Sequence, residues 1–262
     1  MTVNELERPA PSAAIFDPLS VARAVVFSPI GGQGLVEQTV RRLGEAVGLG
    51  LLEVGEQLPP EAELAERLGI APMTLRRALA IMREAGYLET RRGRSGGTFV
   101  RRAVPPAPPR RARARLESLT PDDLRDLTEH RRLVAGGSAA LAAERASLEE
   151  IAELGSLVER MAEPPPFPAF RRADSRFHLA VASAARSPRL AAAERGFQAE
   201  LNEVLALVPR PPEALRLSNE QHRAVLEAIA RREPEAALSL MEAHVVGTGD
   251  FLVGLRLGRV GA

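Results

Sequence analysis

The chain contains no cysteine, no lysine and no tryptophan. Without cysteine, disulfide bonds, thiolate zinc sites and cysteine nucleophiles are excluded, so any metal ion must be held by histidine and carboxylate groups. Aromatic residues make up only 3% of the chain, which argues against a surface of stacked rings for single-stranded RNA. Arginine supplies every basic charge, and we draw no function from that preference.

Long uncharged runs are also missing. The longest stretch without a charged side chain is the 13 residues of 24–36, whereas a membrane-spanning helix needs about 18 or more. The first 18 residues carry Glu5, Glu7 and Asp17 in place of a basic segment and an apolar segment, so no export signal is apparent. We expect a cytoplasmic protein without a membrane partner.

The charges that are present are unevenly distributed. The 262 residues have a net charge of +1, yet residues 1–115 hold 17 arginines against 12 acidic residues, and the remainder holds 18 against 22. Residues 91–115 contain nine arginines and no acidic residue. Such a block attracts a polyanion, although on charge alone a solvated basic linker remains the alternative.

Hydrophobic periodicity divides the chain into two segments of different pattern. Before residue 103, the pattern predicts helices at 34–47, 61–68 and 72–85, followed by strands at 87–91 and 98–100 around a glycine-rich turn. Residues 103–112 contain four prolines and predict an extended linker. Beyond the linker, the pattern predicts helices at 121–146, 148–163, 167–185, 188–208, 213–232 and 234–256.

We therefore expect a mainly α protein, in which an N-terminal winged helix-turn-helix domain is joined to a C-terminal all-helical bundle. The expected divisions are an N-terminal extension (1–30) and the winged domain (31–102). A linker rich in proline and arginine (103–120) then leads to a helical effector-binding and dimerisation domain (121–262).

The third expected helix has a composition suited to the major groove of DNA. On a helical wheel, Leu75, Ala78, Leu79 and Met82 form the buried stripe, and Arg77 points the opposite way. Arginine at such a position can contact guanine, although an ordinary surface helix would show the same pattern. At the tip of the hairpin that follows, Arg92 and Arg94 flank Gly93, where they can contact the DNA backbone. The DNA-binding candidates are Thr74, Arg76, Arg77, Arg92, Gly93 and Arg94.

Residues 51–100 resemble the DNA-binding domain of GntR-family transcription regulators. The match rests on Leu58, Pro59, Glu61, Leu64, Ala65, Leu68, Gly69, Arg76, Ala78, Leu79, Phe99 and Val100. The resemblance implies that Arg76 and the wing residues 92–94 contact DNA. The chain departs from the family at Ala62, at Ala71-Pro72 and at Arg77, where the family often has glutamate, so the operator sequence stays open.

Three of the four histidines can be combined with one carboxylate into a metal site. Asp174 and His178 are four residues apart on one helix face, and His222 and His244 fall in the middle of the last two expected helices. Side chains from facing helices can converge inside a bundle. Such ligands suit Zn²⁺, Ni²⁺, Mn²⁺ or Fe²⁺, although each histidine alone is typical of a surface or core residue.

Residues 121–256 resemble the FCD effector-binding domain of the FadR subfamily. The resemblance implies that Asp174, His178, His222 and His244 hold a divalent metal ion, that a small organic acid binds there, and that Arg131 helps to hold its anionic end. The run LAAERA at 141–146 also matches, whereas Ala135 replaces a family glutamate and Gly136-Gly137 interrupts the first helix.

These expectations describe a homodimeric, sequence-specific repressor that binds a palindromic operator in double-stranded DNA. Its response to a small carboxylate is the leading hypothesis, and sensing of an acyl thioester or another effector without metal is the alternative. A metal-dependent hydrolase is a remote possibility, since Glu220 lies on a different helix face from His222 and no positioned base is evident. A nucleoid-type DNA binder without effector would discriminate little between sequences.

Overall fold

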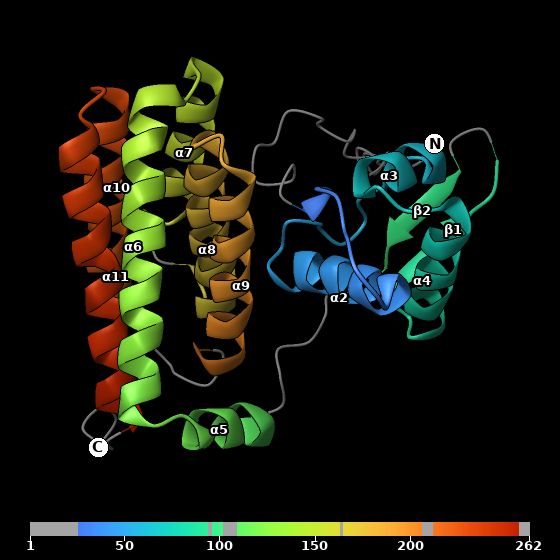
Figure 1. Ribbon diagram of the computed structural model, residues 1–262, viewed down its shortest axis with the longest axis horizontal. Helices are drawn as coiled ribbons and strands as arrows, with labels where there is room; N and C mark the ends of the chain where they lie inside the picture. The colour runs from blue at the N-terminus through green and yellow to red at the C-terminus, as the bar shows by residue number, and fades with distance from the viewer. Residues whose placement is uncertain (1–25, 94–95, 102–108, 163–164, 206–211, 257–262) are drawn as a thin grey trace, which may run out of the picture.

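The computed structural model describes residues 26–93, 96–101, 109–162, 165–205 and 212–256. Figure 1 shows a small N-terminal part beside a larger bundle of long helices. The small part combines helices with a two-stranded sheet, and the bundle is helical. The expected fold class, a winged helix-turn-helix joined to an all-helical bundle, is confirmed.

The N-terminal part follows the expected order of three helices and a hairpin. In α4, the buried residues are Leu75, Ala78, Leu79 and Met82, the stripe predicted from the sequence. The strands pair antiparallel, with Leu88 opposite Val100, and pack on the helices through a shared apolar core. The elements are α2 (Leu35–Gly48), α3 (Glu61–Leu68), α4 (Pro72–Glu84), β1 (Leu88–Arg91) and β2 (Gly97–Val100).

The bundle contains the six helices expected from the sequence, preceded by a helix that was not expected. The expected helices are α6 (Pro121–Arg145), α7 (Leu148–Arg160), α8 (Phe167–Ala184), α9 (Pro188–Leu205), α10 (Pro212–Ala230) and α11 (Pro234–Arg256). Thr120 and Ser147 cap α6 and α7, and each forms a reciprocal capping box with an acidic residue three positions later.

Helix α5 (Pro109–Ser118) corrects the prediction of an extended linker over 103–112. Proline is tolerated in the first turn of a helix, where its missing N–H would have no partner. The alanines and arginines that follow Pro109 favour helix, so the prolines precede or begin this helix without interrupting it. Residues 102–108 lie outside the described residues.

Helices α6 and α11 pack unusually closely because glycines line their contact. A Cβ atom on Gly136 would lie 2.7 Å from Cγ of Glu242. A Cβ atom on Gly249 would likewise collide with the side chain of Thr128. Gly136, one of the two glycines that interrupt the family pattern in α6, therefore makes room for α11.

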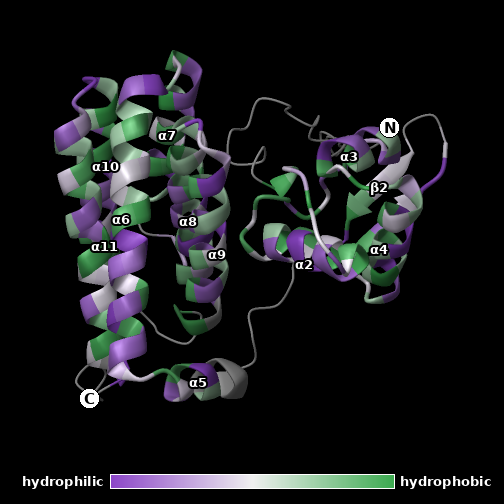
Figure 2. Cartoon of the chain, in the orientation of Figure 1, coloured by the Kyte–Doolittle hydropathy of each residue, from purple (hydrophilic) through white to green (hydrophobic). Residues whose placement is uncertain are grey.

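Helix α11 is the most apolar long helix of the described chain. Its stretch Pro234–Gly254 is long and apolar enough to cross a membrane, with 33% of that stretch buried in the fold. The core helix of a soluble protein meets the same criterion. Here the helix packs along α6 and carries the buried residues Met241, His244 and Val245. Figure 2 shows hydrophobic and hydrophilic residues alternating along the helices of the bundle.

Two helices of the bundle contact the winged domain. Arg176 of α8 forms an ion pair with Glu53 at 2.9 Å, and Arg195 of α9 forms one with Glu45 at 2.9 Å. Gly50 lies directly against the side chain of Arg172. In Figure 1, α8 and α9 form the side of the bundle that faces α2. The two parts therefore contact each other through α8 and α9.

Candidate metal centre

The four residues predicted as metal ligands converge inside the bundle. Helix α8 contributes Asp174 and His178, α10 contributes His222, and α11 contributes His244. All four side chains are buried, and one ligand atom from each lies within 4.8 Å of the others. The spacing of four residues in α8 places its two ligands on one face, and the packing of α10 and α11 supplies the other two.

Three of the distances between these ligand atoms match those around a metal ion, and all four atoms lie within 4.8 Å of one another. Nε2 of His244 lies 3.2 Å from Nε2 of both His178 and His222, and Oδ1 of Asp174 lies 3.5 Å from Nε2 of His222. A tetrahedral ion with ligands at about 2.0–2.1 Å separates neighbouring ligand atoms by about 3.3 Å. The geometry therefore fits a divalent cation at the centre of the cluster.

The hydrogen bonds around two of the histidines also favour a cation. Nδ1 of His244 contacts Oε1 of Gln221 at 3.0 Å, so this nitrogen carries the proton and Nε2 carries a lone pair. Arg131 lies 3.3 Å from Nε2 of His178 and can only donate, so this nitrogen also carries a lone pair. Two lone pairs that face each other at 3.2 Å repel. A cation between them would remove that repulsion.

Burial favours the neutral form of two histidines of the cluster, His178 and His222. It lowers the pKa of His178 well below the ordinary value of 6.5, and the positive charge of Arg131 lowers it further. Burial also lowers the pKa of His222, to about 4, against an opposing effect of Asp174. Because neutral imidazole is the form that binds metal ions, the site is ready to accept a cation at neutral pH.

The pKa of His222 predicts that the metal-free protein becomes less stable in acid. His222 takes up a proton near pH 4 in the folded protein and near pH 6.5 in the unfolded chain. The stability that neutral His222 contributes is therefore complete above pH 6.5 and is lost as the pH falls toward 4. At about 1.4 kcal/mol per pH unit below 6.5, the loss in the free energy of unfolding by pH 5 is at most about 2 kcal/mol. Urea unfolding at pH 7 and pH 5 measures the loss, and His222→Gln should show a smaller one. Equal losses in the two proteins would contradict the prediction.

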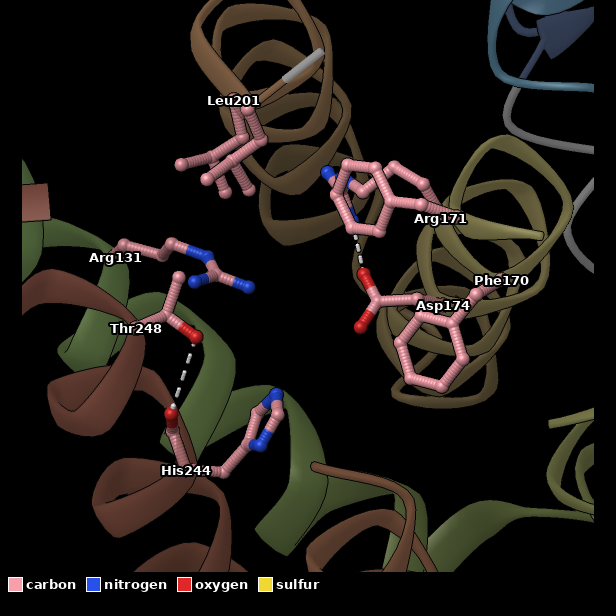
Figure 3. A pocket seen from close by; sticks show the side chains of 9 residues that line it. Arg131, Phe170, Arg171, Asp174, Leu201, His244 and Thr248 are labelled. Atoms are coloured by element: carbon pink, nitrogen blue, oxygen red, sulfur yellow. Dashed lines mark hydrogen bonds and ion pairs between the residues drawn. The ribbon is translucent and has the colours of Figure 1, made fainter. Parts of the chain in front are cut away.

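A small cavity opens beside the cluster, and two arginines line it. The predicted effector residue Arg131, on α6, is only 4% exposed, and Arg171, on α8, is 8% exposed. Figure 3 shows them on opposite sides of the cavity, with Asp174 beside Arg171 and His244 on the side of Arg131. The cavity itself is small, about 20 Å³. Its remaining wall is formed by Phe167, Phe170, Leu201, Leu205 and Thr248.

Several buried polar residues around the cluster were not predicted. Arg171 donates to Oδ2 of Asp174 and, at 2.8 Å, to Gln198. Glu194 is 1% exposed, and its Oε1 lies 3.8 Å from Nδ1 of His178; burial raises the pKa of Glu194. Arg171 and Gln221 hold the outer atoms of Asp174 and His244, as groups around the ligands do in metal sites, and Gln198 connects Arg171 to Glu194.

Of these residues, only Arg171 could have been found from the sequence, because it lies three positions before Asp174 and so shares its helix face. Glu194 and Gln198 come from α9, which carries no predicted ligand. Gln221 reaches His244 on the next helix, 23 residues away. No sequence spacing indicates these contacts.

Of the predicted DNA-binding residues within the described part of the chain, Arg76, Arg77, Arg92 and Gly93 are exposed on the winged domain. In α4, Thr74 is half-buried, whereas Arg76 and Arg77 are exposed. Nε of Arg76 donates to Glu61 of α3 at 3.0 Å. Arg92 and Gly93 are exposed after β1, and Gly93 has a positive φ of 110° that suits glycine. Arg94 lies outside the described residues.

Comparison with known proteins covers both parts of the chain. Residues 35–100 match the family "Bacterial regulatory proteins, gntR family", and residues 126–247 match the FCD domain. Among solved structures, Escherichia coli McbR/YncC superposes with a TM-score of 0.52 over 86% of this chain and 99% of that chain. Its sequence identity is 19%, so this likeness concerns the fold.

Two curated relatives match over most of their length. "Putative HTH-type transcriptional regulator RmpR" of Mycobacterium gastri is 40% identical over 210 residues, 79% of this chain and 76% of that protein. "Putative L-lactate dehydrogenase operon regulatory protein" of Escherichia coli K12 is 33% identical over 202 residues, 74% of this chain and 77% of that protein. The chain therefore belongs to the gntR family of bacterial regulatory proteins, in the group of transcription regulators that combines the winged domain with an FCD domain.

Proposed function

We propose that this regulator is a cytoplasmic, homodimeric repressor whose affinity for a palindromic operator is controlled by a small carboxylate at a metal site in the FCD domain. Asp174, His178, His222 and His244 would hold a divalent ion, with Zn²⁺, Ni²⁺, Mn²⁺ and Fe²⁺ as candidates. Arg131 would hold the anionic end of the effector. Thr74, Arg76, Arg77, Arg92, Gly93 and Arg94 would contact DNA.

The observation that carries the proposal is the buried ligand cluster, which opens onto a cavity lined by Arg131. A divalent ion bound there would supply an electrophilic centre with open coordination positions for a carboxylate. The small volume favours a compact acid over an acyl thioester. A relative at 33% identity is named for an L-lactate dehydrogenase operon, and lactate is a compact acid, although the cavity must widen to admit it.

The chain offers a short route from the effector site to the winged domain. Asp174 and His178 face the cluster, whereas Arg172 and Arg176 are displaced from them by two residues, or about 200° around α8. These arginines reach Gly50 and Glu53 of the winged domain. An acid larger than the cavity must also displace Leu201 or Leu205 of α9, the helix that carries Arg195. Binding can thus bias the contacts that place the winged domain.

Dimer formation follows from the way winged domains bind DNA. One such domain contacts too few bases for specificity, and two half-sites require two-fold symmetry. Helices α6 and α11 expose three large apolar side chains: Leu133 is 61% exposed, and Leu240 and Val246 are each 36% exposed. Homodimer interfaces are more apolar than the rest of the surface, and we propose that these side chains contribute to the contact between subunits.

The test combines metal analysis with an operator titration. Protein purified without a histidine tag should contain about one ion per chain by elemental analysis. An operator fragment is then selected from random DNA, and lactate is titrated into the complex while fluorescence anisotropy reports binding. We expect a change in operator affinity of about 5- to 150-fold. Unchanged affinity across a panel of small carboxylates would show that the proposed control is wrong.

The same titration tests the route through α8. Glu53→Arg should break the ion pair with Arg176 and weaken the response to the acid, and the combined variant Glu53→Arg with Arg176→Glu should restore part of it. Neither residue touches the cavity, so binding of the acid itself should be unchanged. An undiminished response in Glu53→Arg would rule out this contact as the route.

A further inference from the structure

The strongest unassigned feature of the molecule is the second buried arginine of the cavity, Arg171. Its guanidinium contacts Asp174 and Gln198, yet its buried Nε has no hydrogen-bond partner. The buried Nε of Arg131, on the opposite side, also has none. An unpaired buried N–H group is costly, and both guanidinium groups line the same cavity. Each therefore has donor capacity for a ligand.

The charges of the cavity balance only while no metal ion is bound. Arg131 and Arg171 each carry one positive charge, and the buried carboxylates Asp174 and Glu194 offset both when Glu194 is ionised. Burial raises the pKa of Glu194, which can only reduce this compensation. A divalent ion adds two positive charges in the same buried volume. Because uncompensated buried charge is strongly unfavourable, the metal-bound cavity requires two negative charges from its ligand.

Metal binding also makes Arg131 available. In this structure Arg131 uses a terminal nitrogen to contact Nε2 of His178, the atom that would coordinate the ion. The contact between Arg171 and Asp174 can persist when metal binds, since Oδ1 of Asp174 faces the cluster and the other oxygen, Oδ2, accepts from Arg171. Arg171 can thus hold Asp174 in place and still offer its Nε edge to the cavity.

We propose that the effector is a small dicarboxylate, with one carboxylate held at the metal site beside Arg131 and the other held by Arg171. This inference rests on the proposed effector site and specifies its ligand. A monocarboxylate of the same length would leave one positive charge and the Nε edge of Arg171 unpaired. A charge-assisted pair lost in this way corresponds to about tenfold or more in affinity. The cavity must also widen at Leu201 and Leu205 to admit a second carboxylate.

The experiment compares two four-carbon acids that differ in one carboxylate. Succinate and butyrate are titrated by calorimetry into the full-length, zinc-loaded protein, whose zinc content is verified first. We expect succinate to bind at least about tenfold more tightly. In Arg171→Met this preference should vanish, and in Arg171→Lys part of it should remain. Arg172→Met removes the same charge from the other side of α8 and should keep the preference.

The outcomes separate this inference from the proposal beneath it. If neither acid binds the zinc-loaded protein, the proposed effector site itself is wrong, and the dicarboxylate inference falls with it. If both acids bind the wild type equally, only the dicarboxylate inference is overturned. A purely structural role of Arg171 predicts that Arg171→Met lowers zinc content and weakens both acids alike, with the preference intact. That result would also overturn the assignment.

Discussion

Replacing His222 with alanine is expected to remove stoichiometric metal from the protein and to abolish its response to the effector. His222 is fully buried, and its Nε2 lies within 3.5 Å of two other ligand atoms. Loss of an outer-sphere group typically weakens metal binding by about 10- to 100-fold, and loss of a ligand should cost at least that much. Elemental analysis of wild type and variant, prepared side by side, measures the effect.

The fourth histidine provides a matched control. His130 is exposed on α6 and packs edge-on against Phe197 at 4.9 Å, outside the ligand cluster. His130→Ala should therefore retain the metal content of the wild type. DNA binding by His222→Ala should persist without effector, because no residue of the cluster belongs to the winged domain. Unchanged bound metal in His222→Ala would refute the ligand assignment.

Most of the fold could be predicted from the sequence because local signals mark its helix ends. Gly69 takes a positive φ of 64° at the end of α3, and Thr120 and Ser147 cap the helices that follow them. The apolar stripe of α4 follows from helical period alone. The prediction was wrong at α5, where proline content outweighed the helix propensity of the residues after Pro109. Position within a helix decides whether proline is tolerated, and composition does not record position.

The candidate site could be predicted only in part. Asp174 and His178 are linked by their spacing in one helix, His222 and His244 were candidates from their place in the last two helices, and the family resemblance supplied Arg131. The outer groups Glu194 and Gln221 depend on how α9 and α10 are placed against α8 and α11. That placement comes from tertiary packing, such as the close approach that Gly136 allows. Two of the four charged residues of the cavity, Arg171 and Glu194, were therefore missed although Asp174, Arg131 and the histidine ligands were predicted.

Replacing Arg76 with alanine should weaken binding to the selected operator by about 1–3 kcal/mol and relax specificity at the base pair it contacts. Arg76 lies on the flank of α4, with 61% of its side chain exposed, and Glu61 holds its Nε at 3.0 Å. This ion pair leaves the terminal nitrogens free to form two hydrogen bonds to one guanine. Fluorescence anisotropy with the operator and with a scrambled duplex measures both effects.

The comparison between the two duplexes decides what Arg76 contacts. Arg41→Ala serves as the control, because Arg41 is 71% exposed on α2 and its loss removes the same charge from the same domain. If Arg76 contacts a base, Arg76→Ala should weaken operator binding far more than binding to the scrambled duplex. If it contacts a phosphate, Arg76→Ala should bind both duplexes equally more weakly. The slope of log affinity against log salt concentration should then fall by about one. We predict the base-specific loss at Arg76 because Glu61 holds its Nε while its side chain stays exposed, and the operator measurement tests that prediction directly.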